Sequence, residues 1–216
     1  MVHTQQIDQK GAKKPTVYLH IGPHFTGEKH IQNAIVDIQT RLGQQNVCWL
    51  GGKDPDFYHG LADAIEQQDK NKAQSYLDGI SSCLQSNHSV LISSERFSNL
   101  TSWSFFDSVF APFPLHVIAL RREYISRLYA HYSLSNRNTL SPMLLGEFLF
   151  KAMASSEYYI EEANGRLAVR RFFKKMRDSR GSALKLTVLD LDGCLAQGED
   201  IAHAMFCRVL GVQCDV

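Results

Sequence analysis

The sequence predicts a three-layer α/β domain in which a short, mostly parallel central sheet is flanked by helices. Short apolar runs rich in β-forming residues alternate with longer helical patterns along most of the chain, as in parallel α/β proteins. The 216 residues are 44% hydrophobic, 10% aromatic and 21% charged. That composition can form a sizeable core, and it excludes disordered, collagen-like and coiled-coil chains.

The first half of the chain begins with the clearest strand pattern. The run TVYLHI at 16–21 is followed by a turn containing Gly and Pro, and then by apolar residues at helical spacing over about 27–42. A short strand is expected at 46–50, and a helical pattern covers 60–84. The run SVLIS at 89–93 predicts the next strand, because it is short and apolar.

The second half repeats the alternation. The run LHVIAL at 115–120 predicts a strand that leads directly into a helix at about 122–133. Two further helical patterns, at about 140–154 and 157–177, precede a strand at 184–189. Successive strands separated by helices favour parallel pairing, because a parallel pair needs a crossover connection.

We expect a single domain over residues 16–216. Residues 1–15 are polar and end in Lys-Lys-Pro, so they are interpreted as a flexible leader. A last helix is predicted over about 199–210, and Gly211 is the residue type that commonly follows a helix C-terminus.

Charge and cysteine content narrow the function classes. Lys and Arg number 23 against 22 Asp and Glu, which argues against a nucleic-acid-binding protein. No apolar stretch approaches the roughly 18 residues of a membrane span, and the polar start argues against a secretory signal. An odd number of cysteines without C-x-x-C spacing predicts no zinc site and no disulfide scaffold, hence reduced thiols and a cytoplasmic location. The cysteines are Cys48, Cys83, Cys194, Cys207 and Cys214.

The turn after the first strand carries the strongest chemical signal. Gly22 to Lys29 has the G-x-x-x-x-G spacing of a phosphate-binding loop, in which backbone N–H groups and a helix N-terminus face an anion. Glu28-Lys29 replaces the Lys-Ser/Thr pair of ordinary ATPases and GTPases, which argues against those classes. The structural alternative is a tight turn in which Thr26 caps the helix and Glu28 favourably meets its dipole.

The same stretch resembles a family. HIGPHFTG at 20–27, followed by Ile31-Gln32, is similar to the 5′-phosphosulfate loop of the sulfotransferases, which commonly reads Gly-Pro-x-Lys-Thr-Gly-Thr-Thr. Residues 91–98, 117–122 and 186–211 resemble later segments of that family in the same order. The resemblance implies a P-loop-like fold and 3′-phosphoadenosine 5′-phosphosulfate as the sulfuryl donor, with no metal.

The resemblance also implies roles for individual residues. The donor would be bound by Gly22, Pro23, Thr26, Gly27, Lys29, Arg121 and Ser126. Arg121, at a strand end, would hold the 3′-phosphate. The alternative interpretation of Arg121 is a surface arginine that begins a helix. The catalytic candidates are Glu95, Lys29 and His24.

The chain departs from the family pattern inside the loop. Phe25 stands where the family places its lysine, and Glu28 and Lys29 replace two hydroxyl residues. Lys29 could supply the missing charge, whereas Glu28 would compete with an anion. The family serine eight residues after the phosphate-binding arginine is Tyr129 here, so Ser126 is the nearest serine.

Glu95 is the candidate general base, because it follows a buried-looking strand near the loop. Its alternative role is a salt bridge to Arg96 or to another basic residue. His24 is the second candidate base, since it lies within the loop. His20 is interpreted as a hydrogen-bonded histidine near the core.

Two other signals have ordinary explanations. VLDLDGC at 188–194 imitates the first motif of haloacid-dehalogenase phosphatases, but only 24 residues follow Asp192, too few for the rest of that site. We therefore expect a strand end and a turn over 190–193. Residues 164–182 form a basic amphipathic pattern, which predicts a solvated helix face or, alternatively, a region that attracts an acidic acceptor or an anionic surface.

The sequence therefore favours a sulfotransferase-like protein that transfers a sulfuryl group to an acceptor hydroxyl, with a carbohydrate as a candidate acceptor. The alternative is a non-catalytic member of the same fold that binds a nucleotide or an acidic ligand. The expected partner is the nucleotide donor, with no nucleic acid and no membrane span.

Overall fold

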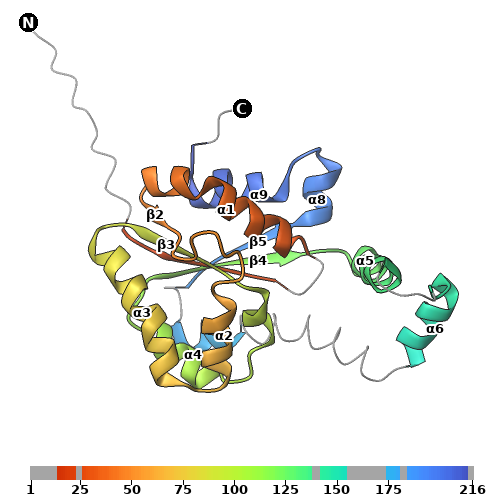
Figure 1. The fold of residues 1–216 in the computed structure, drawn as a ribbon, viewed down its shortest axis with the longest axis horizontal. Coiled ribbons are helices and arrows are strands. Elements are labelled where there is room, and N and C mark those ends of the chain that lie inside the picture. Colours follow the sequence, from red (N-terminus) through yellow and green to blue (C-terminus); the bar gives the residue numbers. More distant parts are fainter. Residues whose placement is uncertain (1–13, 23–25, 138–141, 155–173, 181–183, 214–216) are drawn as a thin grey trace, which may run out of the picture.

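The computed structural model describes residues 14–22, 26–137, 142–154, 174–180 and 184–213 (Figure 1). In these residues five strands form one parallel sheet with the order β2-β3-β1-β4-β5. The strands are β1 (Val17–Ile21), β2 (Val47–Cys48), β3 (Ser89–Ser93), β4 (Leu115–Arg121) and β5 (Lys185–Asp190). The predicted α/β class is confirmed, and every pairing between these strands is parallel.

Helices cover both faces of the sheet (Figure 1). One face carries α1 (Glu28–Gln44), α8 (Leu191–Ala196), α9 (Ile201–His203) and η3 (Ala204–Leu210). The other face carries α2 (His59–Glu66), α3 (Lys70–Gln85) and α4 (Trp103–Phe110), with the short helix η1 (Glu95–Asn99) after β3. Beyond β4, α5 (Tyr124–Arg137) and α6 (Leu145–Ala154) lie to the side of the sheet (Figure 1).

Strand β1 lies at the centre of the sheet, and its side chains alternate between two hydrophobic cores, one on each face. Val17, Leu19 and Ile21 point to the α2–α3–α4 side, whereas Tyr18 points to the α1 side. All of these side chains are almost completely buried, because a strand between two helical layers has no solvated face. His20 shares the α1 side with Tyr18 and is a polar residue inside this apolar layer.

Several predicted elements have different bounds. The helix expected over 60–84 is two helices, because Gln68 has a φ of 56° and Asp69 accepts a hydrogen bond from the Lys72 N–H and caps α3. The strand expected at 46–50 is only Val47–Cys48. The last predicted helix begins as α9 and continues as the π-helical η3, and Gly211 follows it with the expected left-handed φ of 72°.

Cys48 and Cys83 form a disulfide that joins β2 to α3. The expectation of reduced thiols is therefore wrong for this pair. The two residues are 35 positions apart without a spacing motif, so only the fold brings their Cα atoms to 6.4 Å. Because such bonds are rare in reducing compartments, the cytoplasmic location inferred from the cysteines loses its basis.

Two predicted segments lie largely outside the described residues: most of the leader, 1–13, and most of the basic pattern, 164–173 and 181–182. The described part of the basic pattern, 174–180, is helical. Its Arg180 pairs with Asp107 at 3.0 Å and donates to the carbonyl of Phe113, near the amino end of β4. None of the helices in the described ranges has the length and apolar character that crossing a bilayer requires.

Candidate functional site

The candidate site lies at the carboxyl edge of the three central strands. β1 lies between β3 and β4, and the chain order reverses around it, which is where open α/β sheets bind ligands. β1 leads into the loop before α1, β3 leads into Glu95, and β4 ends at Arg121. The fold therefore brings the loop and these two predicted residues to one edge.

The loop meets α1 at Gly27, which has a φ of 96° and is the N-cap residue. This left-handed conformation favours glycine, so the predicted cap at Thr26 is wrong by one position. A Cβ on Gly22 would lie 2.9 Å from Oγ1 of Thr26, so Gly22 and the Thr26 side chain lie close together. The predicted Pro23 and His24 lie outside the described residues.

Glu28 occupies one of the donors that an anion would use. Its Oε2 accepts a hydrogen bond of 2.9 Å from the backbone N–H of Thr26, and both residues are buried. The carboxylate therefore faces back into the loop from the first turn of α1. A phosphate bound there must compete with a negative charge that belongs to the protein.

Glu95 is buried directly after β3 and is held through one oxygen. Its Oε2 accepts hydrogen bonds from Nε2 of Gln32 at 2.9 Å and from Nε2 of His59 at 2.8 Å. Burial tends to raise the pKa of Glu95, but the hydrogen bonds from His59, its own backbone N–H and Gln32 outweigh burial and lower the pKa to about 2. Glu95 is therefore a carboxylate at neutral pH.

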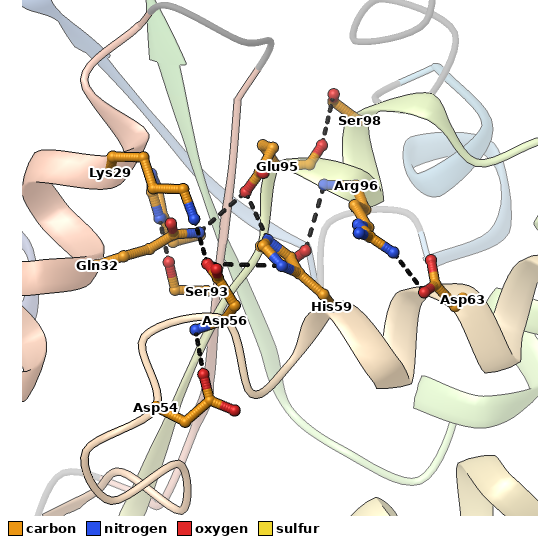
Figure 2. Close-up of polar contacts among 12 residues, drawn as sticks. Lys29, Gln32, Asp54, Asp56, His59, Asp63, Ser93, Glu95, Arg96 and Ser98 are labelled. Carbon is orange, nitrogen blue, oxygen red and sulfur yellow. Dashed lines mark hydrogen bonds and ion pairs between the residues drawn. The ribbon is translucent and has the colours of Figure 1, made fainter.

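A chain of polar contacts joins Glu95 to the predicted loop cation (Figure 2). Nδ1 of His59 lies 3.5 Å from Oδ1 of Asp56, and the same Asp56 oxygen pairs with Nζ of Lys29. Figure 2 shows these residues converging from α1, from the start of α2 and the segment before it, and from η1. Lys29 is thus turned towards a carboxylate of the protein.

His20 adds a second polar group beneath α1. Its Nδ1 lies 2.7 Å from Oγ of Ser93 on β3, as expected for a hydrogen-bonded histidine near the core. Burial lowers the pKa of His20 to about 4, although the carboxylates of Glu28 and Glu95 act in the opposite direction. Nε2 of His20 and Oε1 of Gln32 are two of the buried side-chain atoms that have no hydrogen-bond partner among the described residues.

Arg121 also meets a carboxylate. It pairs with Asp190, at the end of the neighbouring strand β5, and this contact lowers the pKa of Asp190. The Arg121 side chain is 68% exposed, so it is not fixed by packing. Ser126 lies in the first turn of α5, where its N–H donates to the Glu123 side chain at 2.9 Å.

The phosphatase-like motif has a structural role. Asp190 ends β5 and accepts a hydrogen bond from the Gly193 N–H, and Asp192 accepts one from the Glu123 N–H. The expected strand end is confirmed, but the expected turn is instead the start of α8. In the described ranges, no three His, Cys, Asp or Glu side chains are grouped in a way that could hold a metal ion.

Sequence reasoning did not find His59, Asp56 or Gln32 as partners of the predicted residues. His59 and Glu95 are 36 positions apart, and no spacing pattern connects the start of α2 with η1. The one available signal was Ile31-Gln32 inside the family-like motif, which places Gln32 one turn after the loop.

The fold and the site define an α/β protein with a candidate anion-binding loop at the carboxyl edge of a parallel sheet. No family model, curated protein or solved structure matches the chain.

Proposed function

We propose that the protein is a sulfotransferase that transfers a sulfuryl group from 3′-phosphoadenosine 5′-phosphosulfate to an acceptor hydroxyl. One observation carries the proposal: the glycine loop, Glu95 and Arg121 lie at the carboxyl ends of three adjacent strands. The loop and Lys29 would bind the phosphosulfate, and Arg121 would bind the 3′-phosphate. A carbohydrate is the candidate acceptor.

The ion pairs of the two cations can be exchanged for phosphate. Lys29 and Asp56 are about half exposed, and Arg121 is more so, and such surface pairs contribute only about 0–1 kcal/mol each. A charge-assisted hydrogen bond to phosphate contributes about 1.5–3 kcal/mol. A nucleotide could therefore draw both side chains from their carboxylates.

In the transfer step, the acceptor oxygen attacks sulfur while the bond from sulfur to the phosphate oxygen breaks. The products are the sulfate ester and adenosine 3′,5′-bisphosphate, and the hydroxyl proton moves to Oε1 of Glu95. Both side-chain donors bind Oε2, which supports Oε1 as the receiving atom. A weak base suffices, because the hydroxyl becomes strongly acidic as its oxygen bonds to sulfur.

A second candidate is a non-catalytic protein of the same fold that binds a nucleotide or an acidic ligand. The bond from Thr26 to Glu28 favours it, since a donor of the loop is already used. An assay with the labelled sulfuryl donor distinguishes the two candidate functions. A sulfotransferase releases labelled product with a hydroxyl acceptor, whereas a binding protein retains affinity without turnover.

Calorimetric titration tests the nucleotide assignment. Adenosine 3′,5′-bisphosphate should bind about tenfold or more tightly than AMP, because only the former offers Arg121 a 3′-phosphate. The Arg121→Ala variant should remove this preference. Arg41→Ala, which removes an arginine from the last turn of α1, is the matched control and should retain it. Equal affinity for both nucleotides in the wild type would contradict the proposal.

A further inference from the structure

His59 lies between two carboxylates that belong to different parts of the fold. Its Nε2 donates to Glu95 at 2.8 Å, and its Nδ1 faces Asp56 at 3.5 Å (Figure 2). An ionised carboxylate only accepts hydrogen bonds, so Nε2 carries a hydrogen. The imidazole therefore has a defined orientation, with one nitrogen toward each carboxylate.

The backbone around His59 is fixed by packing. Tyr58 is completely buried, and its ring lies 5.3 Å from that of Trp49 and 5.0 Å from that of Phe57. The His59 N–H donates to the carbonyl of Asp56 at 2.8 Å, so the two residues form one turn. Because this turn is anchored, His59 meets Glu95 from a rigid support.

Lys29 links the same turn to the loop. It pairs with the Asp56 oxygen that faces His59, so Asp56 lies between a cation of α1 and the imidazole. If a ligand anion draws Lys29 away from Asp56, the Asp56 carboxylate keeps its contact with His59 alone. The loop, the imidazole and Glu95 are thereby one connected unit.

On the basis of the function proposed above, we infer that His59 is the positioning residue of Glu95. It holds Oε2 of the carboxylate so that Oε1 faces the acceptor, and it keeps Glu95 ionised in a buried place. Gln32 supports the same oxygen from α1. Asp56 orients the imidazole from its other side.

Several charged groups besides His59 surround Glu95. Lys29 approaches from α1, and Asp54 and Asp56 lie in the segment before α2. Asp63 on α2 pairs with Arg96 of η1, and neutral His20 lies on β1. His59 is the ring that donates to Glu95, so its replacement changes a contact as well as a charge.

The first test needs no ligand and no turnover. Carbon-13 NMR of the Glu95 carboxyl should show no titration in the wild type above pH about 3, and His59→Leu should raise the midpoint by about one pH unit or more. His59→Gln, which keeps a side-chain N–H donor, should restore most of the low midpoint. Equal midpoints in all three proteins, or equal rises in the Leu and Gln variants, would overturn the inference.

A measurement on the wild type covers the case in which His59→Leu does not fold. The Nε2–H proton of His59 should give a slowly exchanging imidazole signal, because it is hydrogen-bonded to a buried carboxylate. This signal should disappear in Glu95→Leu, which leaves the Nε2–H without a side-chain acceptor at this position. A rapidly exchanging Nε2–H in the wild type would contradict the inference.

Turnover provides the last test and separates this inference from the proposed function. His59→Leu should lower kcat about 100-fold while changing the affinity for adenosine 3′,5′-bisphosphate less than twofold, and His59→Gln should recover part of kcat. No turnover in the wild type, with the expected NMR result, would overturn the proposed function and leave the link between His59 and Glu95. Normal kcat in His59→Leu would overturn the inference.

Discussion

Glu28 is the residue that weakens the predicted anion site most directly. Its carboxylate accepts the Thr26 N–H at the start of α1, where a phosphate would seek the same donor. We expect Glu28→Gln to strengthen binding of adenosine 3′,5′-bisphosphate by about 0.3–2 kcal/mol, most clearly at low salt. Calorimetry measures this change. Asp37→Asn, which removes an exposed carboxylate further along α1, should have little effect, and equal gains in both variants would contradict the local explanation.

His20 predicts how stability depends on pH. Its pKa is lowered from 6.5 to about 4 in the folded protein. Between these two pH values, His20 therefore binds a proton in the unfolded chain but not in the folded one. Its contribution is present above pH 6.5 and is lost as the pH falls towards 4, amounting to about 2 kcal/mol between pH 7 and pH 5. Urea unfolding at the two pH values measures it. A His20→Gln variant with the same pH dependence as the wild type would contradict this origin.

Ionisation of Glu95 affects the stability of the fold at a lower pH than ionisation of His20 does. Its pKa is lowered from 4.5 to about 2, so its contribution is present above pH 4.5 and is lost as the pH falls towards 2. The two residues can therefore be distinguished by the pH range in which stability declines.

For single residues, the sequence predicted where a residue lies in a strand or helix better than it predicted which side chains the residue contacts. It placed Glu95 after a strand and Lys29 in the first helical turn, because strand ends and helix starts leave local patterns. It missed Asp56 and His59, since their contacts cross between elements and depend on how α2 packs. The Thr26 cap failed because the left-handed φ of Gly27 moves the cap by one residue.

Among the elements, β2 is the shortest strand and carries a covalent bond. The Cys48–Cys83 disulfide closes a loop of 35 residues that includes Asp56 and His59. Restricting such a loop in the unfolded chain stabilises the fold by about 2–4 kcal/mol. Cys83→Ser should lower the free energy of unfolding by that amount in denaturant titrations.

Reductant provides the control for the disulfide. Treating the wild type with dithiothreitol should lower its stability by more than it lowers that of Cys83→Ser, because Cys207 is disulfide-bonded in both proteins and only the wild type also has the Cys48–Cys83 bond. An equal stability of oxidised and reduced wild type would contradict the prediction.

The boundaries of elements were harder to predict than their order. The break between α2 and α3 needs only one left-handed residue, Gln68, and a hydrophobic pattern continues across it. The alternation of strands and helices was predicted correctly except between β3 and β4, where α4 was not expected. The central strands were recognised because burial of both faces makes each of them a continuous apolar run. The pairing order of the strands leaves no such local pattern.

Across the whole molecule, burial is uneven. The central strands β1, β3 and β4 are almost wholly buried, whereas α5 and α6 expose large apolar side chains. These are Tyr129 and Leu134 in α5 and Leu145 and Phe150 in α6. Amide hydrogen exchange should therefore be about 100-fold or more slower in the central strands than in α5 and α6. Equal protection in both regions would mean that the two helices unfold only together with the sheet.

The central place of β1 has a consequence for synthesis on the ribosome. Val17 pairs with Val90 on one side and with Leu115 on the other, so β1 must wait for partners that are made much later. At about 5–20 residues per second, the second partner follows Val17 by roughly 5–20 s. During this interval the nascent chain carries an apolar strand with an open edge. Chains that end before Leu115 should therefore depend on chaperones to stay soluble, although they already contain both cysteines of the disulfide.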